Sequence, residues 1–174
     1  MRRLSLNARN AHLQEHSAEV EVALFCFEHP GLDAPIRLST DPTERLSSDP
    51  LMYGTRSAWL DADPESDPYY FVVASAELPS DLDDATSTAS VVLENVSRDI
   101  AGLLLSFTSL ASVHVAVVLA SSPDVVEAEF RDLKLVSAVV DAGEVSLQLS
   151  RAPIEEETIP MDRFTKDRFP GLFR

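Results

Sequence analysis

The chain has 174 residues, 45% of them hydrophobic, and its 29 acidic and 14 basic residues give a formal net charge of −15. This length and apolar content are sufficient for one domain with a core of its own. The acidic balance argues against a general nucleic-acid binder and against a partner of anionic membranes, because both need a basic surface.

The N-terminal part predicts a helix followed by two strands. An amphipathic helix is expected around Asn7 to His16, followed by the strand "EVEVALFCF", the turn "HPGLDAP" and the strand "IRLST". The single cysteine, Cys26, lies in the first strand, so we expect a buried structural thiol and no internal disulfide. The opening "MRRLSLNARNAHLQEH" has no apolar h-region, and we therefore expect no signal peptide.

The middle of the chain alternates polar connectors with strands. "DPTERLSSDP" is predicted to be a polar connector, "LMYGTRSAW" a short strand or hairpin, and "LDADPESDP" a loop rich in Pro and Asp. "YYFVVASAEL" is predicted to be the next strand, and the acidic loop "PSDLDDATST" separates it from the strand "ASVVLENV".

A long stretch, residues 100–123, contains no formally charged residue. Its first part has the i, i+3, i+4, i+7 spacing of a helix that buries one side, with Ser97 at the N-cap position: Ile100, Leu103, Leu104 and Phe107. The following run "VHVAVVLA" predicts a buried strand. A helix and a core strand explain the stretch better than a membrane span of about 20 residues does.

The last strands give the clearest pattern. "AEFRDLKLVSAVV", a turn at residues 141–143 and "EVSLQLSRAPI" predict a β-hairpin. The whole chain is therefore predicted to be mainly β, an antiparallel β-sandwich or barrel with one inserted helix and an N-terminal helix. We expect residues 1–157 to form this domain and residues 158–174 to form an extended C-terminal docking arm.

Candidate catalytic and metal-binding patterns are weak. "HLQEH" fits the spacing of two zinc-binding histidines, His12 and His16, but a zinc enzyme needs a third ligand and a cleft, so a solvated helix face is the preferred interpretation. His29 is interpreted as a turn residue and His114 as a core or edge histidine. The acidic run with Asp61, Asp63 and Asp67 lacks the glycine and the terminal glutamate of an EF-hand loop.

No nucleophile elbow, P-loop or dinucleotide fingerprint is found in the sequence. We therefore predict no enzyme activity, no catalytic residue, no metal site and no cofactor.

The order of four motifs carries a resemblance to a known family: "HPGLDAPIRL", "LENVSRDI", "VVLASSPDVVE" and the closing "RFPGLF". Together with the sequence around them, they resemble minor tail or tail-tip proteins of long-tailed bacteriophages, the Mu-like and lambda-like siphophages. The resemblance covers about residues 8–173.

This resemblance implies a structural virion protein of the tail tip or baseplate, either a distal ring or an adaptor next to the hub. It implies a tail-tube-like fold, a ring of identical copies, and contacts with tail-tube, tape-measure and hub proteins. The protein would be made in the host cytoplasm and located at the distal tail tip. DNA would pass the ring without specific binding. The many loop carboxylates would suit an acidic channel wall, although solubility explains them equally well.

The C-terminal arm is the candidate subunit interface. Residues 158–174 contain four cations and two anions among several aromatic side chains. The predicted contact residues are Arg163, Phe164, Arg168, Phe169, Pro170, Gly171, Leu172 and Phe173. Docking on another copy or on a neighbouring tail protein is the favoured interpretation, and folding back over the arm's own domain is the alternative.

A second function also fits the predicted fold, a soluble β-sandwich recognition module that binds carbohydrate. Such modules need exposed aromatic platforms, whereas this chain is only 7% aromatic and has one tryptophan. A small hydrolase is a weaker alternative, because no catalytic triad can be assembled from the sequence.

Overall fold

The computed structural model describes residues 4–77, 88–94, 109–141 and 143–151, together with positions 100, 102, 104 and 106. Within these residues the mainly β class is confirmed. The elements in chain order are α1 (Leu6–Leu13), β1 (Glu21–Glu28), β2 (Ile36–Ser39), β3 (Glu44–Ser48), β4 (Leu51–Thr55), the 3₁₀ turn η1 (Trp59–Asp61), β5 (Tyr69–Phe71), β6 (Val73–Glu77), β7 (Thr88–Glu94), β8 (Ser112–Leu119), β9 (Ser122–Val140) and β10 (Glu144–Ser150).

The strands close into a barrel through the continuous run from Tyr69 to Glu77. Its first part, β5, pairs in parallel with β2, and its second part, β6, pairs antiparallel with β7. Between them the N–H of Val72 donates to the carbonyl of Ser39 at 2.8 Å. The ladder therefore runs β2–β1–β8–β9–β10–β7 and returns to β2 through β6 and β5. The predicted single strand "YYFVVASAEL" is divided because its partner changes at Val72, and the β2–β5 pair departs from the predicted antiparallel pairing.

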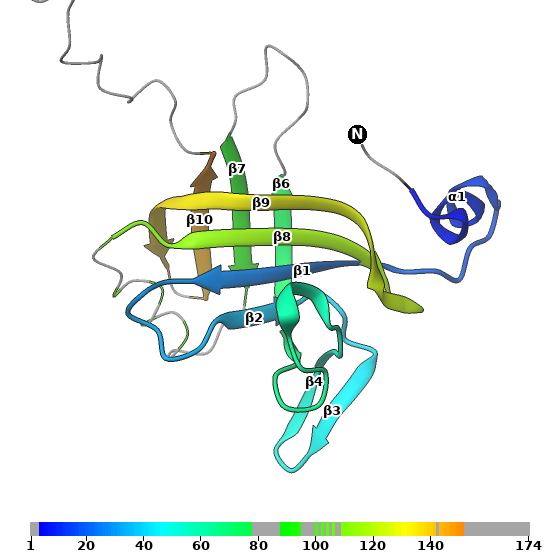
Figure 1. Cartoon of the computed structure of the whole chain (residues 1–174), viewed down its shortest axis with the longest axis horizontal. Helices are drawn as coiled ribbons and strands as arrows, with labels where there is room; N and C mark the ends of the chain where they lie inside the picture. Colours follow the sequence, from blue (N-terminus) through cyan, green and yellow to red (C-terminus); the bar gives the residue numbers. More distant parts are fainter. Residues whose placement is uncertain are drawn as a thin grey trace, which may run out of the picture.

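Two strand directions cross in the barrel (Figure 1). We call β2, β1 and β8 the first layer, and β10, β7 and β6 the second layer. The 19-residue strand β9 pairs with β8 up to Lys134 and with β10 beyond it, so it belongs to both layers.

A bulge bends β9 near the point where its partner changes from β8 to β10. Asp132 has a φ of 58° within the strand, and the register with β8 shifts between Val113 and Val115. The backbone N–H of Asp132 donates to Nδ1 of His114 at 3.2 Å, which satisfies the bulged amide. His114 is only 7% exposed, so the prediction of a core or edge histidine is confirmed.

The barrel interior is filled by alternate residues of both layers. Phe25 and Phe27 of β1 face Val145 and Leu147 of β10 inside one cluster. Leu104, which is helical and 2% exposed, belongs to the same cluster, in agreement with the predicted inserted helix. Ser97, Leu103 and Phe107 of that prediction lie outside the described residues.

The N-terminal helix is shorter than predicted. Ser5 caps it, because its Oγ accepts the N–H of Ala8 at 3.1 Å, and the helix ends at Leu13. Gln14 has an extended conformation, and the chain bends at residues 14–16 before it reaches β1. His16 therefore lies beyond the helix, and the predicted helix, which extended to His16, is too long at its C-terminal end.

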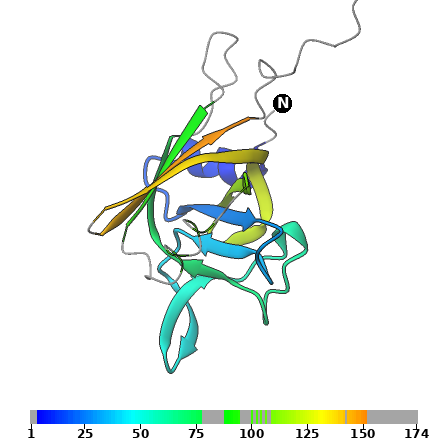
Figure 2. The same ribbon diagram turned by 90° about the vertical axis from the view of Figure 1, so that its left-hand side faces the viewer.

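The predicted polar connector at residues 41–50 is also wrong, since it contains β3. Among the described strands it pairs with β4 alone, and the hairpin projects from the barrel (Figure 2). Because the hairpin covers no interior, its strands can be polar, which explains why the sequence pattern resembled a loop. Gly54 in β4 is needed for close approach, since a Cβ there would lie 1.9 Å from the carbonyl oxygen of Tyr69.

Within the described residues, no helix is long enough and apolar enough to cross a membrane. The uncharged stretch at residues 100–123 instead supplies the interior strand β8 and the buried side chain of Leu104. This agrees with the prediction of a helix and a strand.

Candidate interaction surface

The predicted interface residues lie outside the described part of the chain: Arg163, Phe164, Arg168, Phe169, Pro170, Gly171, Leu172 and Phe173. The described chain ends at Arg151, directly after β10. The division into a domain at residues 1–157 and an arm at residues 158–174 therefore stays a prediction. What the structure does describe is the surface from which the C-terminal segment departs.

The outer side of the first layer is covered by the chain itself. Val22, Leu24 and Cys26 point outward from β1 and form a second cluster, separate from the barrel interior. The segment between β4 and β5 crosses this surface and buries it under Trp59 and Tyr69. Both faces of β1 are thus buried, which accounts for its uninterrupted apolar run.

Hydrogen bonds hold this cover in place. The indole N–H of Trp59 donates to Glu129 of β9 at 2.8 Å, and the hydroxyl of Tyr69 donates to the carbonyl of Trp59 at 2.7 Å. Asp67, at the end of the segment, forms an ion pair with Arg37 of β2. Burial raises the pKa of Glu129, but hydrogen bonds from Trp59 and Arg131 outweigh it, so the pKa is lowered overall.

Cys26 and Tyr69 are structural residues of this cover. Both side chains are fully buried. Burial raises the pKa of the Cys26 thiol to about 11 and also raises the pKa of Tyr69. At neutral pH the thiol is therefore protonated and inert, as the sequence predicted for Cys26.

The outer side of the second layer lacks such a cover among the described residues. Because Val145, Leu147 and Leu149 of β10 point into the barrel, the residues between them point outward. On this side Val136 is 58% exposed and Val139 is 63% exposed. We call this outer side of β7, β10 and the end of β9 the bare face.

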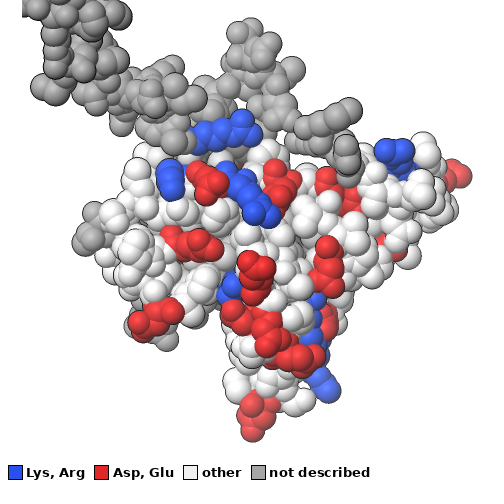
Figure 3. Space-filling view, in the orientation of Figure 1, with Lys and Arg blue, Asp and Glu red and all other residues white. Residues whose placement is uncertain are grey.

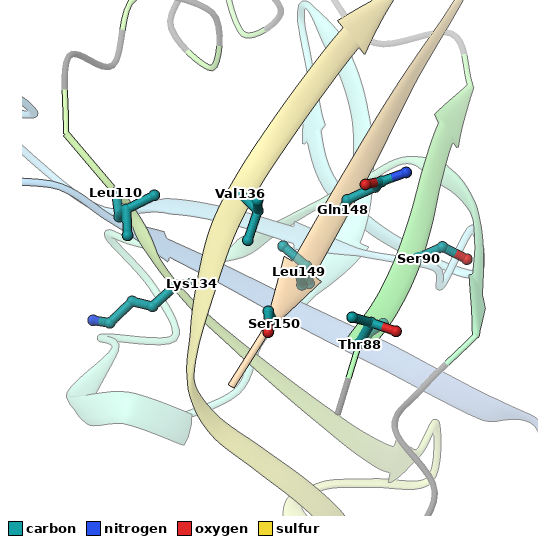
Figure 4. A pocket seen from close by; sticks show the side chains of 9 residues that line it. Thr88, Ser90, Leu110, Lys134, Val136, Gln148, Leu149 and Ser150 are labelled. Atoms are coloured by element: carbon teal, nitrogen blue, oxygen red, sulfur yellow. The ribbon is translucent and has the colours of Figure 1, made fainter. Parts of the chain in front are cut away.

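A hollow of about 510 Å³ lies at the end of the bare face where β10 finishes. Figure 4 shows that its labelled side chains come from β7, β9, β10 and the residues before β8. The hollow is lined by Thr88, Ala89, Ser90, Leu110, Lys134, Val136, Gln148, Leu149 and Ser150. Its lining is uncharged except for Lys134, whose ammonium group donates to Ser112 at 2.8 Å. Such a surface suits the binding of an apolar partner that forms a few hydrogen bonds better than it suits catalysis.

A second exposed apolar feature is α1. Leu6 is 77% exposed and Leu13 is 84% exposed, whereas Ala8 is buried. The backbone N–H of Ser5 donates to Oε2 of Glu127 at 2.7 Å, and Glu127 is itself 5% exposed. The helix is thus held to β9 while its leucines face outward.

The charged residues do not assemble a metal site in the described part of the chain. There, no group of three or more His, Cys, Asp or Glu side chains is arranged to hold a metal ion. Asp63 instead accepts hydrogen bonds from the N–H of Glu65 and the hydroxyl of Ser66, which lower its pKa, and His12 lies 3.2 Å from Glu21. Figure 3 shows acidic side chains gathered where the segment between β4 and β5 crosses the first layer.

The sequence prediction missed the leucines of α1 and the valines of the bare face. A usable signal was present in both. Leu6 and Leu13 are spaced seven residues apart with polar residues between them on that side, a stripe too narrow for core packing. In β9 the run "VSAVV" places apolar residues on both sides of the strand, although only one side can face the interior.

A scan against protein-family models finds no match for the chain, and no curated protein matches it. The resemblance to phage tail proteins therefore stays a prediction.

Proposed function

We propose that the protein is a structural subunit of a bacteriophage tail tip, which assembles with copies of itself into a ring. The bare face is the main support for this proposal. It keeps Val136 and Val139 exposed, and the described chain ends at its margin. An aromatic, cationic segment follows in the sequence at residues 158–174. A barrel whose uncovered face carries exposed valines, followed in the sequence by aromatic and cationic side chains, is suited to assembly.

The proposed partners are identical copies, tail-tube and tape-measure proteins, and the hub. The net charge of −15 suits a ring through which DNA passes, because an acidic wall repels phosphate groups. The proposed role is mechanical, and the predicted lack of enzyme activity belongs to the same proposal.

The test is truncation after Glu157. The shortened protein should melt at the temperature of the full chain as an isolated subunit, because β10 already completes the barrel. It should fail to enter virions, as measured by mass spectrometry of purified particles. The double variant Phe169→Ser with Phe173→Ser should reproduce this defect, whereas Arg163→Ala with Arg168→Ala should have a smaller effect. Absence of the full-length protein from virions would refute the proposed function.

One observation favours carbohydrate binding as a second candidate. Tyr53 and Phe71, on the adjacent strands β4 and β5, are 37% and 38% exposed, and because Gly54 pairs with Tyr70 they lie on the same face of the sheet. Half-exposed aromatic side chains on neighbouring strands can stack on sugar rings. Calorimetric titration of host-surface polysaccharide would detect binding, and Phe71→Ala should abolish it if this candidate is correct. Heat changes that persist in Phe71→Ala would exclude the aromatic platform.

A further inference from the structure

The exposed leucines of α1 form one narrow apolar stripe. Leu6 and Leu13 are seven residues apart, so they project from nearly the same side of the helix about 10 Å from each other along its axis. Ala8, which is 1% exposed, lies on the opposite side of the helix. Two leucines that are 77% and 84% exposed contribute nothing to the interior of their own subunit.

The stripe is held in a fixed position. Glu127 is buried within β9, and its carboxylate accepts the N–H of Ser5 at the start of the helix at 2.7 Å. A carboxylate at this end of a helix is also stabilised by the helix dipole. Because this hydrogen bond already anchors α1 to β9, the helix loses little conformational entropy when its leucines bind a partner.

The bare face matches this stripe in spacing and in charge. Val136 and Val139 are three residues apart on β9, and the bulge at Val136 places both on the outer side, at most about 10 Å apart and close to the separation of the two leucines. Residues 1–14 contain three arginines and no acidic residue. At one end of the second layer, Glu94 at the end of β7 and Glu144 at the start of β10 lie directly opposite each other. Two such like charges favour the approach of a cation.

The two features are too far apart to meet within one subunit. The anchor of α1, Glu127, and the hollow residue Lys134 are seven positions apart on β9, or about 23 Å along the strand. Figure 1 shows α1 beyond one end of the barrel and β10 toward the other. A contact between them must therefore join different copies.

We propose that α1 of one copy docks on the bare face of the next copy, with Leu6 and Leu13 against Val136 and Val139. Each subunit then donates one helix and accepts one, which is a head-to-tail contact. Contacts of this kind close into rings or continue as filaments. The proposal rests on the proposed function in taking a second copy as the partner, but it assigns a contact that does not involve the C-terminal arm.

Disulfide trapping tests the geometry. In a full-length Cys26→Ala background, the double variant Leu13→Cys with Val136→Cys should form dimers, trimers and larger covalent species under mild oxidation. Either cysteine alone can link at most two chains, so the single variants are the matched controls. No covalent species in the double variant, or a disulfide within one chain, would overturn the proposal.

Sedimentation of the full-length protein tests the energetics. Leu6→Ser with Leu13→Ser should weaken self-association roughly tenfold or more, because two apolar anchors are lost. Leu51→Ser is the control, since Leu51 is 60% exposed on the projecting β3–β4 hairpin and should leave association unchanged. Unchanged association in the α1 variant, or association lost only on truncation after Glu157, would refute docking by α1.

The two proposals fail separately. If the protein is found in virions but the α1 variant associates normally, the proposed function stands and the helix contact does not. If the α1 contact forms in solution but virions lack the protein, the contact stands and the tail function does not.

Discussion

The two outer faces of this barrel are treated in opposite ways. On the first layer the outward row is apolar, with Val22, Leu24 and Cys26, and the segment carrying Trp59 buries it. On the second layer the outward row mixes serine, threonine, glutamine and glutamate with a few valines, and Val139 stays 63% exposed. An outward row as apolar as the first must be covered within the chain, whereas the second can meet water and still bind a partner. The outer face of the first layer therefore stabilises the subunit, whereas the outer face of the second layer is available for assembly.

Removing the cover should have the largest effect. Trp59→Ala should lower the free energy of unfolding by about 3–5 kcal/mol, because it opens a cavity over the outer row of β1 and β8 and leaves Glu129 without its indole donor. Denaturant unfolding of the purified subunit measures this. A loss under about 1 kcal/mol would mean that the segment is not a structural cover.

Two adjacent tyrosines give a sharper contrast. Tyr69→Phe should cost about 1–3 kcal/mol, because the buried carbonyl of Trp59 loses the hydroxyl that donates to it. Tyr70→Phe is the matched control, since Tyr70 is 41% exposed and the change should stay within about 0.5 kcal/mol. Equal losses in the two variants, in the same unfolding assay, would contradict the difference in burial.

The elements that sequence analysis predicted well are those with strong local patterns. The runs in β1 and β8 are apolar at consecutive positions, and the β9–β10 hairpin alternates around a short turn. What it missed depends on contacts distant in sequence. Strand β3 is polar because it lies outside the barrel, and the division at Val72 follows from a change of partner between β2 and β7. No pattern within residues 69–77 encodes which strands they will join.

A third prediction concerns pH and the cover. The folded-state pKa of Glu129 is lowered, so Glu129 stabilises the fold above its ordinary pKa of 4.5, and this contribution is lost as the pH falls through the folded-state value. Unfolding curves from about pH 6 to pH 3 should show a shallower acid loss in Glu129→Gln than in the wild type. Trp59→Phe should also make the loss shallower, because it removes one donor to Glu129. An unchanged slope in both variants would show that these hydrogen bonds do not set the pKa.

The candidate surface was harder to predict than the fold. The sequence drew attention to residues 158–174 because aromatic and cationic side chains are concentrated there. The leucines of α1 form a stripe too narrow for core packing, which is a weaker signal, and their exposure of 77% and 84% shows that they face outward. The run "VSAVV" indicates that some valines of β9 face outward, but it does not tell which ones. Which side of a strand faces the interior is settled by the closure of the barrel.

The smallest expected effect is on the bare face, and it completes the comparison. Val139→Ser should change the free energy of unfolding by no more than about 0.5 kcal/mol, because the side chain is already 63% exposed and loses few contacts. Val145→Ser, in the adjacent strand, is the control from the interior side, where the residue is 2% exposed and the change should be strongly destabilising. If Val139→Ser leaves stability unchanged but weakens self-association in sedimentation, Val139 contributes to binding of a partner and not to the stability of the fold. A loss of stability comparable to that of Val145→Ser would show that the bare face is covered within the subunit, and the contrast between the two layers would fail.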